Sequence, residues 1–182
     1  MIHYADLINR YYEPGSHASE ILLVHSRLVT NKALHIASEK HLDLNPDLIT
    51  AAGMLHDIGI CFTNAPTIEC HGAEPYIRHG IIGAGLIRAA GLPENIARVA
   101  ERHTGAGITA QEIIEQQLPL PQGDYMPHTL LEQLICYADK FYSKGRNLTI
   151  EKSPEEARRS LERFGAETLK RFDALHAIFG QR

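Results

Sequence analysis

The sequence predicts an all-α protein, and three observations support this class. Apolar residues recur near the 3.6-residue period of a helix in several segments. Helix start and stop signals lie beside those segments. The sequence has no convincing run of alternating β-branched residues and no Asn-Gly hairpin signal. We therefore expect a single-domain bundle of about six to eight helices over residues 1–182, with a core at about 20–145 and a C-terminal helix at about 153–179 packed on it.

The helical segments differ in how they are marked along the chain. Pro14-Gly15 stops the first segment, the second shows clear 3.6 periodicity, and Pro46 suits the first turn of the third. That third segment is mostly apolar, which predicts a buried helix. In chain order, the expected helices span residues 6–12, 19–41, 47–56, 78–90, 94–103, 109–117, 129–142 and 153–179.

The later helices begin at recognisable caps. Thr109 and Glu112 have the spacing of a capping box, and Ser153-Pro154 followed by two acids is a strong helix start. Residues 60–77, by contrast, are interrupted by proline and glycine, which predicts a long irregular loop. Loops of this length in a compact domain are usually functional. This one is either an ordinary connector or a wall of a substrate pocket, and we expect the wall because the loop directly follows His56-Asp57.

Composition limits the class of partner. The chain has a net charge of −4, 44% hydrophobic and 22% charged residues, so we expect neither a nucleic acid polymer nor a membrane as the main partner. No apolar run approaches the roughly 18 residues of a membrane span, and no secretory signal is visible. The three cysteines show no paired spacing, which indicates a reduced, cytoplasmic protein. Homo-oligomerisation is left open.

The chemistry centres on His56 and Asp57. The apolar run that precedes them predicts a rigid, buried helix, and two polar side chains at its end break the hydrophobic pattern. An imidazole and a carboxylate together suit divalent metals such as iron, manganese or zinc. Two adjacent ligands do not complete a metal site, so further ligands must come from other helices.

The chain supplies such ligands at helix ends or on apolar helix faces. Helical bundles build metal sites from side chains on facing helices, so residues far apart in the sequence are suitable partners. Together with the first pair, the candidate metal ligands are His25, His56, Asp57, His79, His103 and Asp139.

Four of these residues resemble a known pattern. His25, the tetrapeptide His56-Asp57-Ile58-Gly59 and Asp139 are similar to the metal-ligand signature of the HD-domain metal-dependent phosphohydrolases, over about residues 20–145. The resemblance implies that these four side chains hold a metal, and that His79 and His103 add a second one, with Asp57 as the bridge. The segment after His103 lacks the longer signature of the cyclic-di-GMP phosphodiesterases, so that substrate is not implied.

The ligand types indicate a reaction. Two divalent ions about 3.5–4 Å apart can clamp a phosphate and lower the pKa of a bridging water, which then attacks phosphorus. We therefore predict a phosphohydrolase with His56 and Asp57 at its catalytic centre, acting on a nucleotide or other small phosphorylated metabolite. The cofactor would be two divalent ions, with Fe, Mn, Mg, Co and Zn not distinguished. Expected substrate contacts are Lys140, Lys144, Arg27 and His71.

Other interpretations stay open. His79 and His103 could support a single metal or bind phosphate, and His71 could be an ordinary surface residue. The whole protein could be a sensor that binds metal and nucleotide without turnover, or a di-iron oxygenase like some members of the superfamily. A purely structural bundle would leave the six candidate ligands unexplained.

Overall fold

The computed structural model describes residues 3–145 and 147–180, and within them the fold is helical, which confirms the all-α class. Nine α-helices are found in this part of the chain. They are α1 Tyr4–Tyr11, α2 His17–Glu39, α3 Pro46–Leu55, α4 His79–Ala89, α5 Glu94–Arg102, α6 Ala110–Glu115, α7 Leu130–Asp139, α8 Pro154–Ser160 and α9 Ala166–Phe179.

Local caps set many of the helix starts. The Ser16 side chain accepts a hydrogen bond from the backbone of Ser19 at the start of α2, and Asn45 does the same for Asp47 at the start of α3. Full capping boxes begin α6, α7 and α8. The spacing of Thr109 and Glu112 predicts the first of them, and Ser153 is the expected N-cap of α8. These starts depend on neighbouring residues only, which is why the sequence predicts them well.

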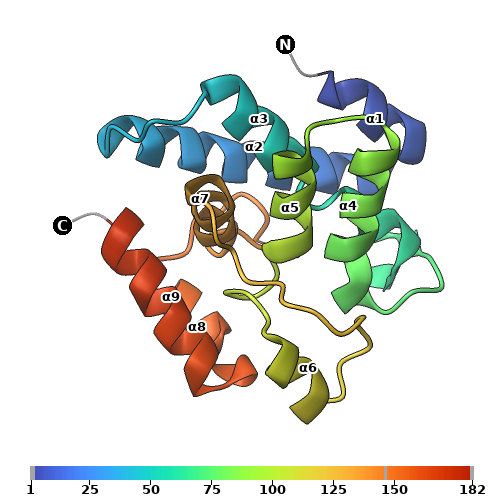
Figure 1. Ribbon diagram of the computed structural model, residues 1–182. Helices are drawn as coiled ribbons and strands as arrows, with labels where there is room; N and C mark the ends of the chain where they lie inside the picture. Colours follow the sequence, from blue (N-terminus) through green and yellow to red (C-terminus); the bar gives the residue numbers. More distant parts are fainter. Residues whose placement is uncertain (1–2, 146, 181–182) are drawn as a thin grey trace.

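Helix α7 runs through the centre of the molecule and is seen nearly end-on in Figure 1. It contacts α2, α3, α5 and α9, and most of its side chains are buried. α2 packs on α3, and α4 packs on α5 (Figure 1). The C-terminal ends of α3, α5 and α7 therefore reach the same interior region.

The chain between α3 and α4 is more ordered than the irregular loop expected for residues 60–77. It contains three 3₁₀ turns, η1 Ile58–Phe62, η2 Pro66–Ile68 and η3 Tyr76–Arg78. Two short strands, β1 Asn64–Ala65 and β2 Cys70–His71, pair in an antiparallel ladder. Strands of two residues carry too little alternation for a sequence pattern to predict them.

Glycine allows the η1 turn to lie against α4. A Cβ at Gly59 would collide with the backbone carbonyl of His79 and would lie 2.5 Å from the backbone nitrogen of Gly83. Only glycine permits this close approach. The contact fixes the first residues of α4 next to the turn that follows His56-Asp57.

The C-terminal segment differs from the expected single helix at 153–179. It breaks after α8, passes through η4 Glu162–Phe164 and resumes as α9. Gly165 has φ +92°, outside the helical region, and it is the N-cap of α9. The segment therefore holds two α-helices where one was expected, and the described residues contain nine α-helices instead of six to eight. The break also places Arg163 and Phe164 on a turn.

No described helix combines the length and the apolar composition needed to cross a bilayer. The three cysteines are free thiols.

Candidate metal centre

The structure brings all six predicted ligand side chains into one buried cluster. None of the six residues is more than 8% exposed. They come from the middle of α2, the C-terminal ends of α3, α5 and α7, and the start of α4. Their ligand atoms form two groups that share Asp57. We call these the four-residue group, which contains His25, His56, Asp57 and Asp139, and the three-residue group, which contains Asp57, His79 and His103.

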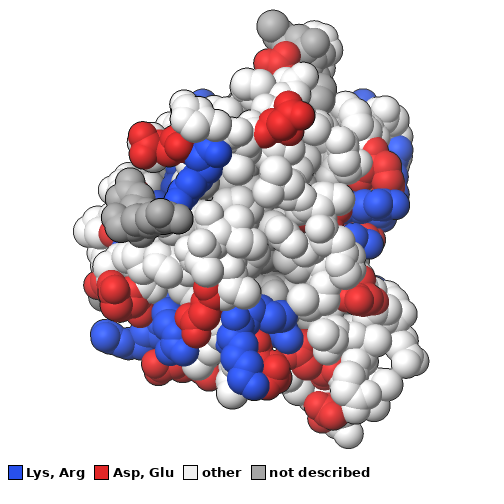
Figure 2. Space-filling view, turned by 60° about the vertical axis from the view of Figure 1, so that its left-hand side comes forward, with Lys and Arg blue, Asp and Glu red and all other residues white. Residues whose placement is uncertain are grey.

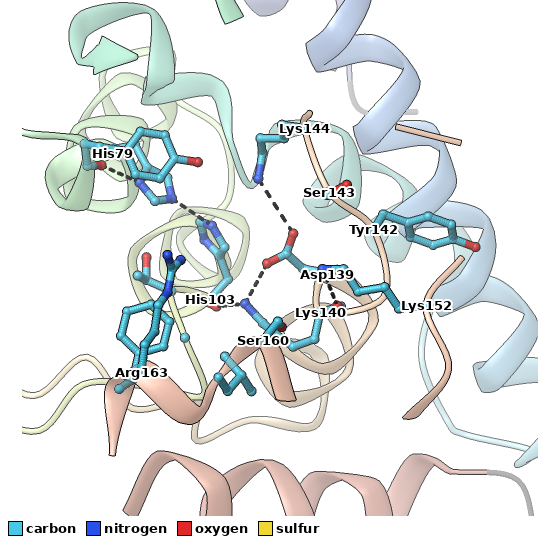
Figure 3. A pocket seen from close by; sticks show the side chains of 15 residues that line it. His79, His103, Asp139, Lys140, Tyr142, Ser143, Lys144, Lys152, Ser160 and Arg163 are labelled. Atoms are coloured by element: carbon cyan, nitrogen blue, oxygen red, sulfur yellow. Dashed lines mark hydrogen bonds and ion pairs between the residues drawn. The ribbon is translucent and has the colours of Figure 1, made fainter. Parts of the chain in front are cut away.

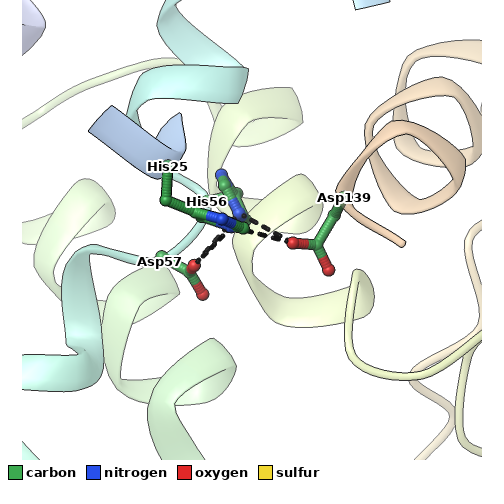
Figure 4. Close-up of side chains that lie close together, drawn as sticks. All are labelled: His25, His56, Asp57 and Asp139. Atoms are coloured by element: carbon green, nitrogen blue, oxygen red, sulfur yellow. Dashed lines mark hydrogen bonds and ion pairs between the residues drawn. The ribbon is translucent and has the colours of Figure 1, made fainter. Parts of the chain in front are cut away.

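In the four-residue group, two imidazoles lie between two carboxylates, as Figure 4 shows. Nε2 of His25 lies 3.0 Å from Oδ1 of Asp139 and 3.3 Å from Oδ2 of Asp57. Nε2 of His56 lies 3.1 Å from Oδ2 of Asp57 and 3.4 Å from Oδ1 of Asp139. Two nitrogens and two oxygens therefore point at one small volume.

The three-residue group uses the other oxygen of Asp57. Its Oδ1 lies 3.5 Å from Nε2 of His79 and 3.3 Å from Nε2 of His103. The two imidazole nitrogens are 3.0 Å apart. One carboxylate thus faces both groups, with a different oxygen toward each.

The second ring nitrogen of three histidines is held by the backbone in the same way. Nδ1 of His56, His79 and His103 lies 2.7–2.8 Å from the carbonyl oxygen three residues earlier. A carbonyl can only accept, so the hydrogen is on Nδ1, and a neutral ring then presents the lone pair of Nε2 to the cluster. Backbone support of this kind is typical of metal-binding histidines.

Several buried polar atoms of the cluster have no hydrogen-bond partner among the described residues. They include Nε2 of His56 and Oδ1 of Asp57, whereas Oδ2 of Asp57 lies close to the ammonium of Lys144. Unpaired buried polar atoms are costly, and lone pairs of His79 and His103 facing each other would repel. Divalent cations would satisfy these atoms, and the N/O donor set suits iron, manganese, cobalt or zinc. The helix ends at the site favour positive charge as well, because the C-terminus of a helix carries partial negative charge.

Two lysines compensate the buried carboxylates. Lys144 Nζ lies 2.7 Å from Oδ2 of Asp57, and Lys140 Nζ lies 2.6 Å from Oδ2 of Asp139. Burial would raise the pKa of Asp57, but His56 and Lys144 outweigh it and hold this pKa well below the ordinary value. Burial would also raise the pKa of Asp139, but Lys140 and Lys144 hold this pKa well below its ordinary value. Both acids are therefore ionised and able to bind cations at neutral pH.

The histidines divide by their surroundings. Burial lowers the pKa of His79, and neighbouring His103 lowers it further, to about 3. Burial also lowers the pKa of His103. Burial acts in the same direction on His56, but the carboxylates of Asp57 and Asp139 outweigh it and raise the pKa to about 9. The three-residue group thus presents neutral imidazoles. His56, by contrast, is protonated at neutral pH in the absence of a metal, and a bound cation would displace the proton from its Nε2.

A cavity of about 260 Å³ opens beside the cluster. His79, His103 and Asp139 form part of its wall, so the cluster is reached from this cavity. Figure 3 shows the cavity's basic side chains around these three residues. The basic residues that line it are Lys140, Lys144, Lys152 and Arg163.

Of the four predicted substrate contacts, two line the cavity and two do not. Lys144 lines the cavity with 18% of its side chain exposed, and its ammonium is also paired with Asp57. Lys140 also lines it, but its ammonium donates to Asp139 and to the carbonyl of His103, so its observed contacts orient the cluster. Arg27 and His71 are exposed, and neither is among the described residues that line this cavity.

Sequence reasoning did not single out most of the other residues of the cavity wall, among them Tyr76, Lys152 and Arg163. Tyr76 is the only residue of the 60–77 segment found among the described lining residues. Arg163 reaches the cavity because the C-terminal segment breaks at Gly165. In the sequence, that glycine is the one signal that could have predicted the break.

Comparison with known proteins agrees with this geometry. The model of the HD domain family matches residues 22–143. An uncharacterized protein of Methanocaldococcus jannaschii is 40% identical over 124 residues, which are 66% of each chain. The tRNA (cytidine(56)-2'-O)-methyltransferase of Thermoplasma volcanium is 30% identical over 90% of this chain and 44% of its own length. The corresponding enzyme of Picrophilus torridus is 33% identical over 75% of this chain and 36% of its own length. The chain therefore spans less than half the length of these two methyltransferases.

Among solved structures, the HD domain of the phosphodiesterase PgpH of Listeria monocytogenes has a similar fold, with a TM-score of 0.56 and 16% sequence identity over 97% of both chains. The same domain in complex with cyclic-di-AMP gives a TM-score of 0.52 and 18% identity over 90% of this chain and 93% of that one. The family match, the His-Asp cluster and the shared fold lead to one conclusion: the chain belongs to the HD-domain family.

Proposed function

We propose that this protein is a metal-dependent phosphohydrolase that cleaves a phosphoester in a small molecule, with activated water as the nucleophile. One observation carries the proposal. The two oxygens of Asp57 face two separate groups of ligand atoms, and this shared carboxylate lies next to a cavity lined by four basic side chains. Family membership supports the same class of reaction.

The residues of the chain divide the work. Lys144, Lys152 and Arg163 attract and orient the phosphate in the cavity, because ammonium and guanidinium groups bind phosphate oxygens strongly. Lys140 keeps Asp139 ionised and aimed at the cluster. The bound ions would supply the activated water and neutralise charge that develops on the phosphate.

A small substrate suits the surface better than a polymer. On the face shown in Figure 2, basic side chains alternate with acidic ones, whereas nucleic acid binding favours a continuous basic area. Two of the relatives are named as tRNA methyltransferases, so tRNA and its terminal phosphates belong in the substrate panel as a competing class.

The test is a substrate screen with added Mn²⁺, Fe²⁺, Co²⁺, Zn²⁺ or Mg²⁺. Phosphomonoesters, cyclic and linear phosphodiesters, nucleotides and tRNA should be included, with released phosphate or product measured by chromatography. We expect cleavage of a small phosphoester by the wild type and none by Asp57→Ala. The matched control is Asp43→Ala, an exposed acid before α3, which should leave activity unchanged.

The alternatives predict other results. Thermal stabilisation by a nucleotide without any product would favour a sensor, and iron-dependent oxygen consumption would favour an oxygenase. No turnover of any phosphoester with any metal would refute the proposal.

A further inference from the structure

A second cavity, of about 350 Å³, adjoins the first, and none of the six cluster residues is among its described lining residues. The two cavities share five lining residues, so they lie side by side. The shared residues are Tyr76, Thr104, Gly105, Arg163 and Phe164. We call the second cavity the outer compartment.

The two compartments differ in chemistry. The first carries the basic side chains and the cluster, and the outer compartment is lined mainly by apolar atoms, with Ile77, Ile108 and Leu118 in its wall. Ligand sites commonly combine an apolar pocket with a few polar groups that fix orientation. A phosphoester bound across both would place its phosphate in the first compartment and its organic group in the outer one.

Two aromatic side chains stand where the compartments meet. Tyr76 and Phe164 are 41% and 40% exposed, although side chains of this size are usually more deeply buried. The Tyr76 ring lies 4.7 Å from the His79 ring, and the guanidinium of Arg163 lies 4.6 Å above the Phe164 ring. Both contacts place flat π surfaces beside the junction.

Polar groups in the outer compartment argue against a simple aliphatic occupant. Glu112 pairs with Arg171 at 2.7 Å, and Arg171 also donates to the carbonyl of Gly107, which ties α9 to the segment around α6. An aliphatic chain would cover these groups and the amide of Gln116 without bonding to them, which is unfavourable. A flat heteroaromatic group offers donors and acceptors at its edge and stacks on aromatic faces.

We propose that the outer compartment holds the base of a nucleoside phosphate, with Tyr76 and Phe164 as specificity-determining residues. This inference rests on the proposed function for the position of the phosphate. Its walls come partly from residues 163–171, which lie beyond the 22–143 region matched by the family model.

The test compares adenosine 5′-monophosphate with ribose 5-phosphate, because the two share the phosphate and the sugar and differ in the base. Binding to the protein loaded with Mg²⁺ or Zn²⁺ is followed by NMR, which detects weak complexes. We expect the nucleotide to bind at least about 10-fold more tightly, since stacking on one aromatic residue is worth about 1–3 kcal/mol per base. Equal affinities, or no detectable binding of the nucleotide, would overturn the inference.

Variants identify the residues responsible. Phe164→Ala should weaken nucleotide binding about 10-fold and leave ribose 5-phosphate unchanged, and Phe164→Tyr should restore it. Tyr76→Leu provides a second, independent variant. Ile178→Ala is the control, because it removes an exposed apolar side chain of α9 that is not among the described lining residues of either cavity. If Phe164→Ala and Tyr76→Leu, both folded, weaken the two ligands equally or not at all, the assignment is wrong.

The result separates this inference from the proposed function. Preferential nucleotide binding, together with no turnover of any phosphoester in the substrate screen with any metal, would retain the outer compartment and refute the phosphohydrolase. Cleavage of both compounds at equal efficiency, unaffected by Phe164→Ala, would retain the phosphohydrolase and refute the assignment of the outer compartment to the base.

Discussion

The four-residue group and the three-residue group share Asp57 but differ in charge and in access. The four-residue group has two carboxylates, and one of its residues, Asp139, lines the cavity. The three-residue group has one carboxylate, and both of its histidines line the cavity. We therefore expect the first group to bind a cation more tightly and the second to hold one that exchanges and meets the substrate. Within one cluster, the number of carboxylates can set how tightly a cation is bound, and the position of the ligands can set which cation meets the substrate.

The largest expected effect comes from the shared residue. Asp57→Ala removes a ligand from both groups, so both cations should be lost and activity should fall by at least about 1,000-fold, which corresponds to about 4 kcal/mol. Metal analysis of the purified variant and the phosphoester assay measure the two effects. Retention of the wild-type metal content in Asp57→Ala would show that this carboxylate is not the bridge.

The next effect separates the groups. His103→Ala should lose only the cation of the three-residue group, and Asp139→Ala should lose the more tightly bound one. The ratio of metal to chain, measured after gel filtration, should therefore fall from about two to about one in His103→Ala. If His103→Ala and Asp139→Ala lose metal equally at every metal concentration, the groups do not differ as we infer.

A smaller effect is expected at the cavity wall. Lys144→Met should lower kcat/KM by about 10- to 100-fold, because a hydrogen bond to a charged group is worth about 1.5–3 kcal/mol. Its metal content should stay at the wild-type value. The control is Lys170→Met, whose side chain is 71% exposed on α9 and which should change neither quantity. Loss of metal in Lys144→Met would assign the lysine to the cluster instead of to the phosphate.

The smallest effect concerns the packing that positions His79. Gly59→Ala forces a Cβ into the backbone of α4 and should reduce the free energy of unfolding by about 1–3 kcal/mol. Because α4 carries His79, the three-residue group should lose metal before the four-residue group does. Gly85→Ala on the same helix meets no atom within 4 Å and should be neutral or stabilising by up to about 1 kcal/mol. Denaturant unfolding measures the stability of the two variants, and metal analysis measures their cation content. Equal free energies of unfolding in Gly59→Ala and Gly85→Ala would contradict the packing argument.

Local signals predict the helices well and their interruptions poorly. The capping boxes at Thr109 and Ser153 begin helices as expected, because a cap involves only residues three apart. The break at Gly165 was missed, since a single glycine in an otherwise helical segment does not say whether the helix will continue. The expected wall at 60–77 contributes only Tyr76 among the described lining residues of the first cavity.

The candidate site was predicted more fully in its ligands than in its cavity. His25 and Asp139, 114 positions apart, were chosen for their residue type and setting, and their side chains lie 3.0 Å from each other. The sequence does not predict Arg163 and Lys152 as substrate contacts, because basic side chains on surface segments are common and follow no motif spacing. Lys140 was expected at the substrate, and its observed contacts are with Asp139 and the backbone.

The sequence by itself determined the helical class, the starts of α1 to α8 to within two residues, and the identity of the six side chains that could bind metal. These properties depend on short-range backbone bonding and on the donor atoms of each residue type. Only the tertiary structure decided that the two oxygens of Asp57 face different groups, and that residues 163–171 close the outer compartment. Both depend on how distant helices pack, and packing is a property of the whole core that no local pattern encodes.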